Sequence, residues 1–176
     1  INGLLTMRQG WNRVREEPIL KFFVLALTFY GMSTLEGPLM SIKSVNLFTH
    51  YTDWTVAHVH GGALGWLGGF IFAMSYYMVP KLWGKPLYSK SMANNHFWVA
   101  TIGILLYISS MYAAGITQSL MWMATNEDGL LKYPQFLETV LALKPLYWTR
   151  LVGGTLFLFG TLMCIYNLYK TAKSGQ

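Results

Sequence analysis

The sequence predicts an all-α integral membrane protein with four transmembrane helices. Two observations support this fold class. Of the 176 residues, 53% are hydrophobic and only 11% are charged, whereas soluble domains carry about a quarter charged residues. The chain also contains four apolar stretches of the roughly 20 residues that a helix needs to cross a bilayer core. They are residues 18–42, 54–79, 97–123 and 146–169, within one membrane domain that covers residues 1–176.

Turn-rich or charged connections separate the four stretches. Residues 44–53 (SVNLFTHYTD) precede the second stretch, and residues 80–90 (PKLWGKPLYSK) precede the third. The last connection, residues 124–145, is long for a loop, and we expect either a short helix around 135–143 or a plain reconnecting segment. Isolated prolines such as Pro38 are tolerated in membrane helices when neighbouring groups satisfy the freed carbonyls.

The distribution of charge predicts the orientation in the membrane. The net charge is +6, but no basic run is present, so nucleic acid is not expected as a partner. Cytoplasmic loops of membrane proteins carry an excess of lysine and arginine. One side of the predicted bundle, which includes both chain ends, holds nine basic residues: Arg8, Arg13, Arg15, Lys21, Lys81, Lys85, Lys90, Lys170 and Lys173. We therefore expect both ends in the cytoplasm and the loop 44–53 on the outer side.

Two histidines, His58 and His60, stand at the start of the second stretch. Successive residues of an α-helix are rotated by about 100°, so the two rings point in nearly opposite directions and do not bind one metal ion together. Haem suits this arrangement, because one axial imidazole suffices for each iron and a porphyrin stacks flat against a helix. Gly62 and Gly65 follow on the face of His58, where a bulky side chain would collide with a macrocycle. The pair therefore predicts two cofactors, one on each side of the helix.

The same residues have a simpler interpretation as helix packing. Gly61, Gly65 and Gly69 match the small-xxx-small spacing of close membrane helix contacts, and an intramembrane histidine can hydrogen-bond a neighbouring helix. This alternative predicts a colourless, non-catalytic membrane subunit. A simple dihaem electron-transfer cytochrome is a further alternative, and it predicts haem without carbon monoxide binding. Cys164, the single cysteine, lies in an apolar run, and we interpret it as a packing residue.

Three further side chains are expected near the histidine pair. Glu36 is the only carboxylate inside a predicted span, and its simplest role is to accept the free ring N–H of a ligating histidine. A protonated glutamate bonded to a backbone carbonyl is the structural alternative. His50 in the outer loop and Arg150 at the outer start of the fourth stretch are candidates for the region of haem propionates, against simple solvation or interfacial snorkelling. We interpret His96, at the other end of the bundle, as structural.

Four motifs carry a resemblance to a known family: TLEGP at 34–38, HYTDWTVAHVHGGALGW at 50–66, NNHFWVATIGILLYISSMYAAGITQSLMW at 94–122 and YWTRLVGG at 147–154. Together they resemble the catalytic subunit of cbb3-type cytochrome c oxidases, the C family of haem-copper oxygen reductases. The resemblance runs over nearly the whole chain. It implies a bacterial inner-membrane enzyme with a bundle of roughly twelve helices, which reduces oxygen to water with electrons from cytochrome c and couples this reaction to proton translocation.

The resemblance also implies roles for single residues. His58 matches the proximal ligand of the high-spin haem b, and His60 matches an axial ligand of the low-spin haem b. Glu36 matches the glutamate that interacts with the proximal histidine. His50 matches the loop histidine near the propionates, and Arg150 matches a propionate arginine.

Other parts of the family's machinery are expected outside this chain. The copper ligands, the cross-linked tyrosine, the second axial histidine of the low-spin haem and the main proton-uptake pathway lie upstream of the matching region in this family. We therefore expect the chain to be the C-terminal third of the subunit, inactive alone. Its expected partners are the rest of that subunit, haem c-bearing subunits, cytochrome c and membrane lipid. The nearest alternative is a nitric oxide reductase catalytic subunit, which shares the two-haem histidine pair but holds iron in place of copper.

Overall fold

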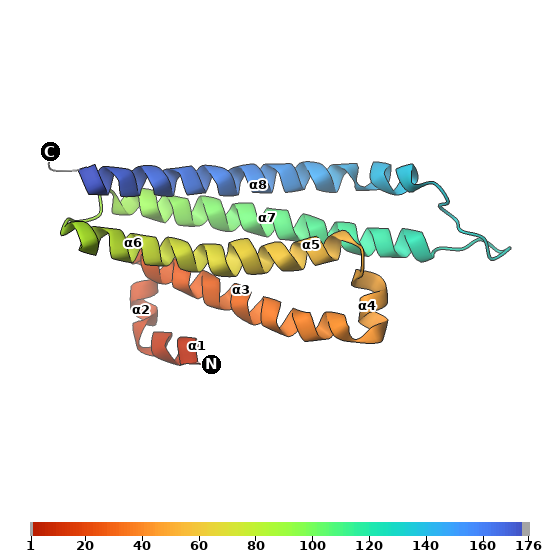
Figure 1. Ribbon diagram of the computed structural model, residues 1–176, viewed down its shortest axis with the longest axis horizontal. Helices are drawn as coiled ribbons and strands as arrows, with labels where there is room; N and C mark the ends of the chain where they lie inside the picture. Colours follow the sequence, from red (N-terminus) through yellow and green to blue (C-terminus); the bar gives the residue numbers. More distant parts are fainter. Residues whose placement is uncertain (1, 174–176) are drawn as a thin grey trace.

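The computed structural model describes residues 2–173, the side chain of Gln9 excepted. Over this range the chain is helical, with one isolated bridge between Thr125 and Leu131 and no strand. The long helices lie side by side in an elongated bundle (Figure 1). The elements are, in order, α1 (Asn2–Met7), η1 (Arg8–Gly10), α2 (Trp11–Val14), α3 (Pro18–Ser41), α4 (Lys43–Thr49), α5 (Asp53–His60), η2 (Gly61–Gly68), α6 (Gly69–Trp83), α7 (Lys90–Met123) and α8 (Phe136–Lys173).

The expected all-α fold with four membrane-spanning helices is confirmed. Four helical segments of the described chain are long and apolar enough to cross a membrane: Pro18–Ser41, Asp53–Trp83, Lys90–Met123 and Phe136–Lys173. The second segment joins α5, η2 and α6 without a break. Helices α7 and α8 begin several residues before the apolar stretches do, because hydropathy marks only the part of a helix that matches the bilayer core.

The connections contain more helix than a simple loop would. Part of the loop 44–53 belongs to α4, which spans Lys43–Thr49. The helix expected around 135–143 exists, but it is the first part of α8 rather than a separate element. Pro145 lies inside α8 and does not end it. The irregular part of the last connection is therefore confined to residues 124–135.

Local chemistry fixes the start of α5. Thr52 is its N-cap, with Oγ1 accepting the backbone N–H of Trp54 at 3.3 Å. Asp53 places a negative charge in the first turn, where the helix dipole favours it. The backbone N–H of Asp53 donates to Oε1 of Gln118 on α7 at 2.6 Å, and Nε2 of Gln118 donates back to the Asp53 carboxylate at 3.0 Å. These contacts hold the helix that carries both histidines against α7.

Helix α7 is the central helix of the bundle. In its most apolar part 44% of the residues are buried, against 22% in each of the other three spans. It approaches α8 closely where two glycines meet, since a Cβ at Gly103 would lie 2.8 Å from the carbonyl oxygen of Gly153. Ile104, Ile108 and Met111 of α7 are buried in the adjoining core. The outer faces of the helices expose many large apolar side chains, as expected of helices that meet lipid or further protein.

The α6–α7 connection meets the last turns of α8 at one end of the bundle (Figure 1). Polar contacts join the two segments there. The backbone N–H of Ser89 donates to Oδ1 of Asn167 at 3.0 Å, and Nδ2 of Asn167 donates to the Ser89 carbonyl at 2.8 Å. Lys90 pairs with Glu17 at 2.7 Å. The lysines of this connection and the last residues of α8 therefore share one end of the molecule, opposite the end that holds α4.

Candidate functional site

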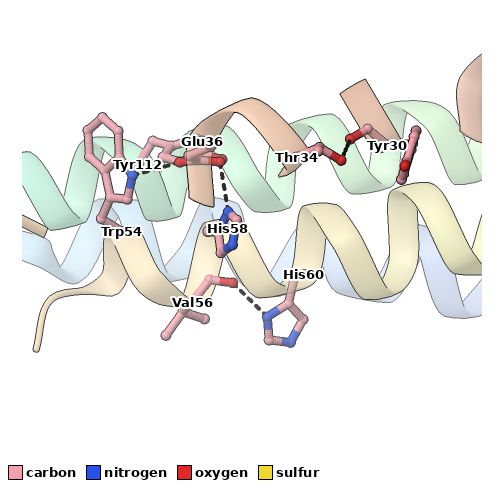
Figure 2. Close-up of polar contacts among 8 residues, drawn as sticks. All are labelled: Tyr30, Thr34, Glu36, Trp54, Val56, His58, His60 and Tyr112. Atoms are coloured by element: carbon pink, nitrogen blue, oxygen red, sulfur yellow. Dashed lines mark hydrogen bonds and ion pairs between the residues drawn. The ribbon is translucent and has the colours of Figure 1, made fainter. Parts of the chain in front are cut away.

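The two histidines of α5 lie in its last turn and point to different sides of the helix (Figure 2). Nδ1 of His58 lies 3.1 Å from Oε2 of Glu36 on α3. Nδ1 of His60 lies 2.8 Å from the carbonyl oxygen of Val56, one turn earlier on α5, and the ring centroid of His60 is 4.9 Å from that of Tyr107 on α7. The rings therefore do not converge on one point, as the helical spacing predicts.

The hydrogen bonds define which ring nitrogen is free. A backbone carbonyl only accepts, so Nδ1 of His60 carries the proton and Nε2 keeps its lone pair. His58 donates its Nδ1–H to a carboxylate in the same way. Within the described chain neither Nε2 atom has a hydrogen-bond partner. Metal-bound histidines show this pattern, with the second nitrogen held by a carboxylate or a carbonyl. Both rings are half-buried, and each one offers Nε2 as a ligand.

The carboxylate of Glu36 is the most heavily hydrogen-bonded group at the site. Glu36 is 8% exposed. Its Oε1 accepts the indole N–H of Trp54 at 2.6 Å, and its Oε2 accepts the hydroxyl of Tyr112 at 2.6 Å in addition to the His58 N–H. Three donors from α5 and α7 thus surround one acceptor on α3. A carboxylate can accept all three of these bonds at once, whereas a protonated acid would have to donate one of them.

Sequence reasoning missed Trp54 and Tyr112. Trp54 carried a usable signal, because it stands four residues before His58 and so faces the same side of α5. Tyr112 carried none, because it is separated from Glu36 by 76 positions and meets it only in the folded bundle.

A π-helical segment, η2, follows His60 directly and spans Gly61–Gly68. Such wide turns are rare in proteins overall, and those that occur are often found at functional sites. A Cβ at Gly65 would lie 2.5 Å from Cδ1 of Phe29 on α3, so an aromatic ring already occupies the space in front of this glycine. The role of Gly65 beside a macrocycle stays a prediction, and the space next to it is filled here by the Phe29 ring of α3. Gly62 has more room, since a Cβ there would lie 3.6 Å from Oγ of Ser33.

Arg150 lies on the side of His60. Its guanidinium carbon is 5.5 Å from the ring centroid of Tyr107, and Nη1 is 3.6 Å from Sδ of Met111. No acidic side chain of the described residues pairs with it. Arg150 lines a cavity of about 400 Å³ between α7 and α8, whose walls also include Tyr107, Tyr147 and Gly154. Tyr107, which lines this cavity, also packs on the ring of His60, and the unpaired cation of Arg150 is suited to an anionic group there.

Two other histidines are placed apart from this pair. His50 is exposed at the end of α4, and its ring contacts that of Tyr51 at 3.9 Å, with no contact to His58 or His60 among the described residues. His96 is fully buried, its Nδ1 lies 3.0 Å from the hydroxyl of Tyr76, and the ring of Phe72 packs on it at 4.6 Å. His96 therefore belongs to the core at the opposite end of the bundle from α4.

The donor set fits haem better than a free metal ion. Residues 2–173 contain no group of three or more histidine, cysteine or acidic side chains that could hold a metal ion. Each of the two α5 histidines instead offers one nitrogen on its own side of the helix, and a haem iron needs only one such axial ligand from this helix.

Comparison with known proteins gives a consistent result. The profile of the family described as "Cytochrome C and Quinol oxidase polypeptide I" matches residues 1–156. A cytochrome c oxidase subunit 1 homolog, bacteroid, of Bradyrhizobium diazoefficiens is 52% identical over 100% of this chain and 32% of its own length. A cbb3-type cytochrome c oxidase subunit of Stutzerimonas stutzeri is 48% identical over 100% of this chain and 37% of its own length. The chain thus spans about a third of these relatives.

Two further matches are more distant in sequence. A nitric oxide reductase subunit of Stutzerimonas stutzeri is 27% identical over 78% of this chain and 29% of its own length. Among solved structures, one chain of a haem-copper terminal oxidase dimer aligns with a TM-score of 0.70 at 23% identity, covering 90% of this chain and 27% of that chain.

Proposed function

This chain belongs to the cytochrome c and quinol oxidase polypeptide I family, with cbb3-type subunits among its similar relatives, and on that premise we propose that it is the C-terminal part of an oxygen-reducing catalytic subunit. The complete subunit would reduce oxygen to water with electrons from cytochrome c and couple this reaction to proton translocation. The observation that carries the proposal is the α5 histidine pair. Both Nδ1 atoms contact an oxygen, and within residues 2–173 neither Nε2 atom, on its own side of the helix, has a hydrogen-bond partner.

In this proposal His58 is the proximal ligand of a high-spin haem b, and His60 is an axial ligand of a low-spin haem b. Haem iron held in this way supplies one-electron transfer at both sites and oxygen binding at the first, with copper held by a part of the subunit outside this chain. Arg150 lies beside the cavity on the His60 side and would neutralise a propionate. His50 would contact the propionate region from the outer end, and Gly62 would border the macrocycle at His58.

The residues of the chain contribute binding and orientation. Helix α5 is a rigid element that fixes the separation and the opposite directions of His58 and His60. Glu36 accepts the Nδ1–H of His58, which fixes its tautomer and increases the basicity of Nε2. His60 is oriented by the Val56 carbonyl, a neutral acceptor, so its Nε2 is the weaker electron donor of the two.

The surroundings follow from the same proposal. Large apolar side chains on the outer faces of the bundle would be covered by lipid and by the remaining helices of the subunit. The basic end of the bundle would face the cytoplasm of a bacterium, with the complex in the inner membrane. Haem c-bearing subunits would deliver electrons from cytochrome c.

The test is an optical spectrum of the complete complex that contains this chain. The dithionite-reduced sample is compared with the same sample after carbon monoxide is added, and its copper content is measured. We expect one haem b that responds to carbon monoxide, a second that does not, and bound copper. The same haems with non-haem iron in place of copper would support a nitric oxide reductase instead. A colourless complex would contradict the haem assignments of His58 and His60.

A further inference from the structure

We propose that Trp54 and Tyr112 are positioning residues that hold the charge of Glu36 and limit how far this carboxylate draws the ring proton of His58. The two side chains would thereby set the donor strength of His58 toward iron. This inference rests on the proposed function, because it concerns the ligand of the high-spin haem. Both side chains donate hydrogen bonds to Glu36, whose carboxylate contacts the His58 ring.

The geometry makes Trp54 and Tyr112 one unit around Glu36. Their rings pack edge to face, with centroids 5.0 Å apart and an angle of 71°. The indole N–H reaches Oε1 and the phenol hydroxyl reaches Oε2, each at 2.6 Å (Figure 2). Both bonds are shorter than the 3.1 Å contact from His58 to the same carboxylate. Charge-assisted hydrogen bonds of this kind are the strong ones.

The backbone is arranged to allow this contact. A Cβ at Gly115 of α7 would lie 2.8 Å from the Cβ of Trp54, so only glycine lets α5 come this close. Gly115 stands three residues after Tyr112 and therefore lies near it on α7. The close approach brings the indole and the phenol to the same carboxylate.

The environment offers Glu36 few other donors. Beside the carboxylate lies a cavity of about 410 Å³ lined by Met32, Leu35, Glu36, Leu39, Trp54 and Tyr112. The three lining residues other than Glu36 and its two donors are apolar. An unpaired carboxylate in such a place is costly. Within the described chain, loss of the Trp54 donor leaves Oε1 without a hydrogen bond, and loss of the Tyr112 donor leaves Oε2 with His58 alone.

The three donors compete for the same negative charge. Tyr112 and His58 share Oε2, and Trp54 withdraws charge through Oε1. Each donor takes up part of the negative charge that the carboxylate oxygens offer, so fewer donors leave more of this charge for the remaining hydrogen bonds. Removal of the Tyr112 or the Trp54 donor therefore makes Glu36 a stronger acceptor, and the Nδ1 proton of His58 moves toward it. Nε2 of His58 becomes a stronger donor as a result.

The test uses Tyr112→Phe and Trp54→Phe in the complete complex, with Glu36→Gln for comparison. Two readouts are the midpoint potential of the carbon monoxide-binding haem and its iron–histidine stretching frequency in the reduced state. We expect both donor variants to lower the potential and raise the frequency. Glu36→Gln, which removes the negative charge, should shift both quantities in the opposite direction. Trp98→Phe and Tyr166→Phe, which change exposed side chains away from Glu36, should shift neither.

The opposite signs make the outcome decisive. The proposal would be overturned if a donor variant that retains both haems shifts the potential and the frequency in the same direction as Glu36→Gln, or shifts neither. If one donor variant fails to assemble, the other is sufficient for the test. A comparison of the wild-type complex with His58→Ala separates failure of this proposal about Trp54 and Tyr112 from failure of the proposed function. If the wild type has an iron–histidine band that His58→Ala removes, the function stands whatever the donor variants show. If this band persists in His58→Ala, the assignment of His58 itself is wrong.

Discussion

The two histidines of α5 are each held at Nδ1 by an oxygen, but the two oxygens come from different kinds of group. His58 is held by a buried carboxylate from another helix, and this carboxylate is itself held by donors from α5 and α7. His60 is held by a carbonyl of its own helix, four residues earlier, and its ring packs on Tyr107. The first arrangement is charged and depends on the tertiary fold, whereas the second is neutral and local. The comparison teaches that two histidines on one helix can differ in the donor strength of Nε2 toward iron, because the groups that hold their Nδ1 atoms differ.

The largest effect is expected when the imidazole ring of His58 or of His60 is removed. His58→Ala should abolish the carbon monoxide-binding haem signal, and His60→Ala should abolish the signal of the other haem, because each ring would ligate only the haem on its own side. Optical spectra of the purified complex measure both. If either substitution removes both signals from a complex that is still assembled, the two sides are not independent.

A second test breaks the backbone contact on one side only. Gly115→Ala would bring a methyl group against Trp54, and overpacking of this kind costs about 1–3 kcal/mol. We expect a lower temperature for thermal loss of the high-spin haem spectrum. The matched control is Gly154→Ala on the His60 side, where a Cβ would lie 3.5 Å from the Tyr107 ring, an ordinary contact. Equal destabilisation by the two substitutions would contradict the assigned close approach.

A third test removes the charge that distinguishes the two sides. Glu36→Gln keeps the size of the side chain but offers His58 a neutral acceptor, as the Val56 carbonyl does for His60. The potential of the high-spin haem should rise by an amount of the order of 60 mV, a tenfold change in a one-electron equilibrium. Redox titration of the complex measures it. An unchanged potential would remove Glu36 from the environment of the proximal ligand.

The smallest effect is expected from Arg150. Its guanidinium is half-buried and stacks on Tyr107, an interaction worth about 0.5–1 kcal/mol at exposed sites. Arg150→Gln removes a positive charge, which should lower the potential of the haem at His60 slightly and leave that of the other haem unchanged. The same redox titration resolves the two. A shift confined to the high-spin haem would place Arg150 on the wrong side in our proposal.

The predictable part of the molecule is the part that depends on local rules. The four membrane helices follow from apolar length, and the divergence of His58 and His60 follows from helical rotation. The approach of Glu36 to His58 could be expected from their similar depth in two neighbouring helices. Tyr112 could not, because its contact joins residues 76 positions apart. The crowding of Gly65 by Phe29 was missed for the same reason, since it depends on how α3 packs and on π-helical turns.

Helix α7 touches both histidine environments, through Tyr107 beside His60 and Tyr112 beside Glu36. The two tyrosines are five residues apart, so they lie about 140° apart around the helix axis. One helix therefore contacts both the His60 ring and the Glu36 carboxylate. A sideways movement or rotation of α7 would therefore disturb both ligand environments in one event. A change at one histidine without the other has to come from the helices beside α7. A movement of α3 would displace Glu36 and change the environment of His58, and a movement of α8 would displace Arg150 and change the environment of His60.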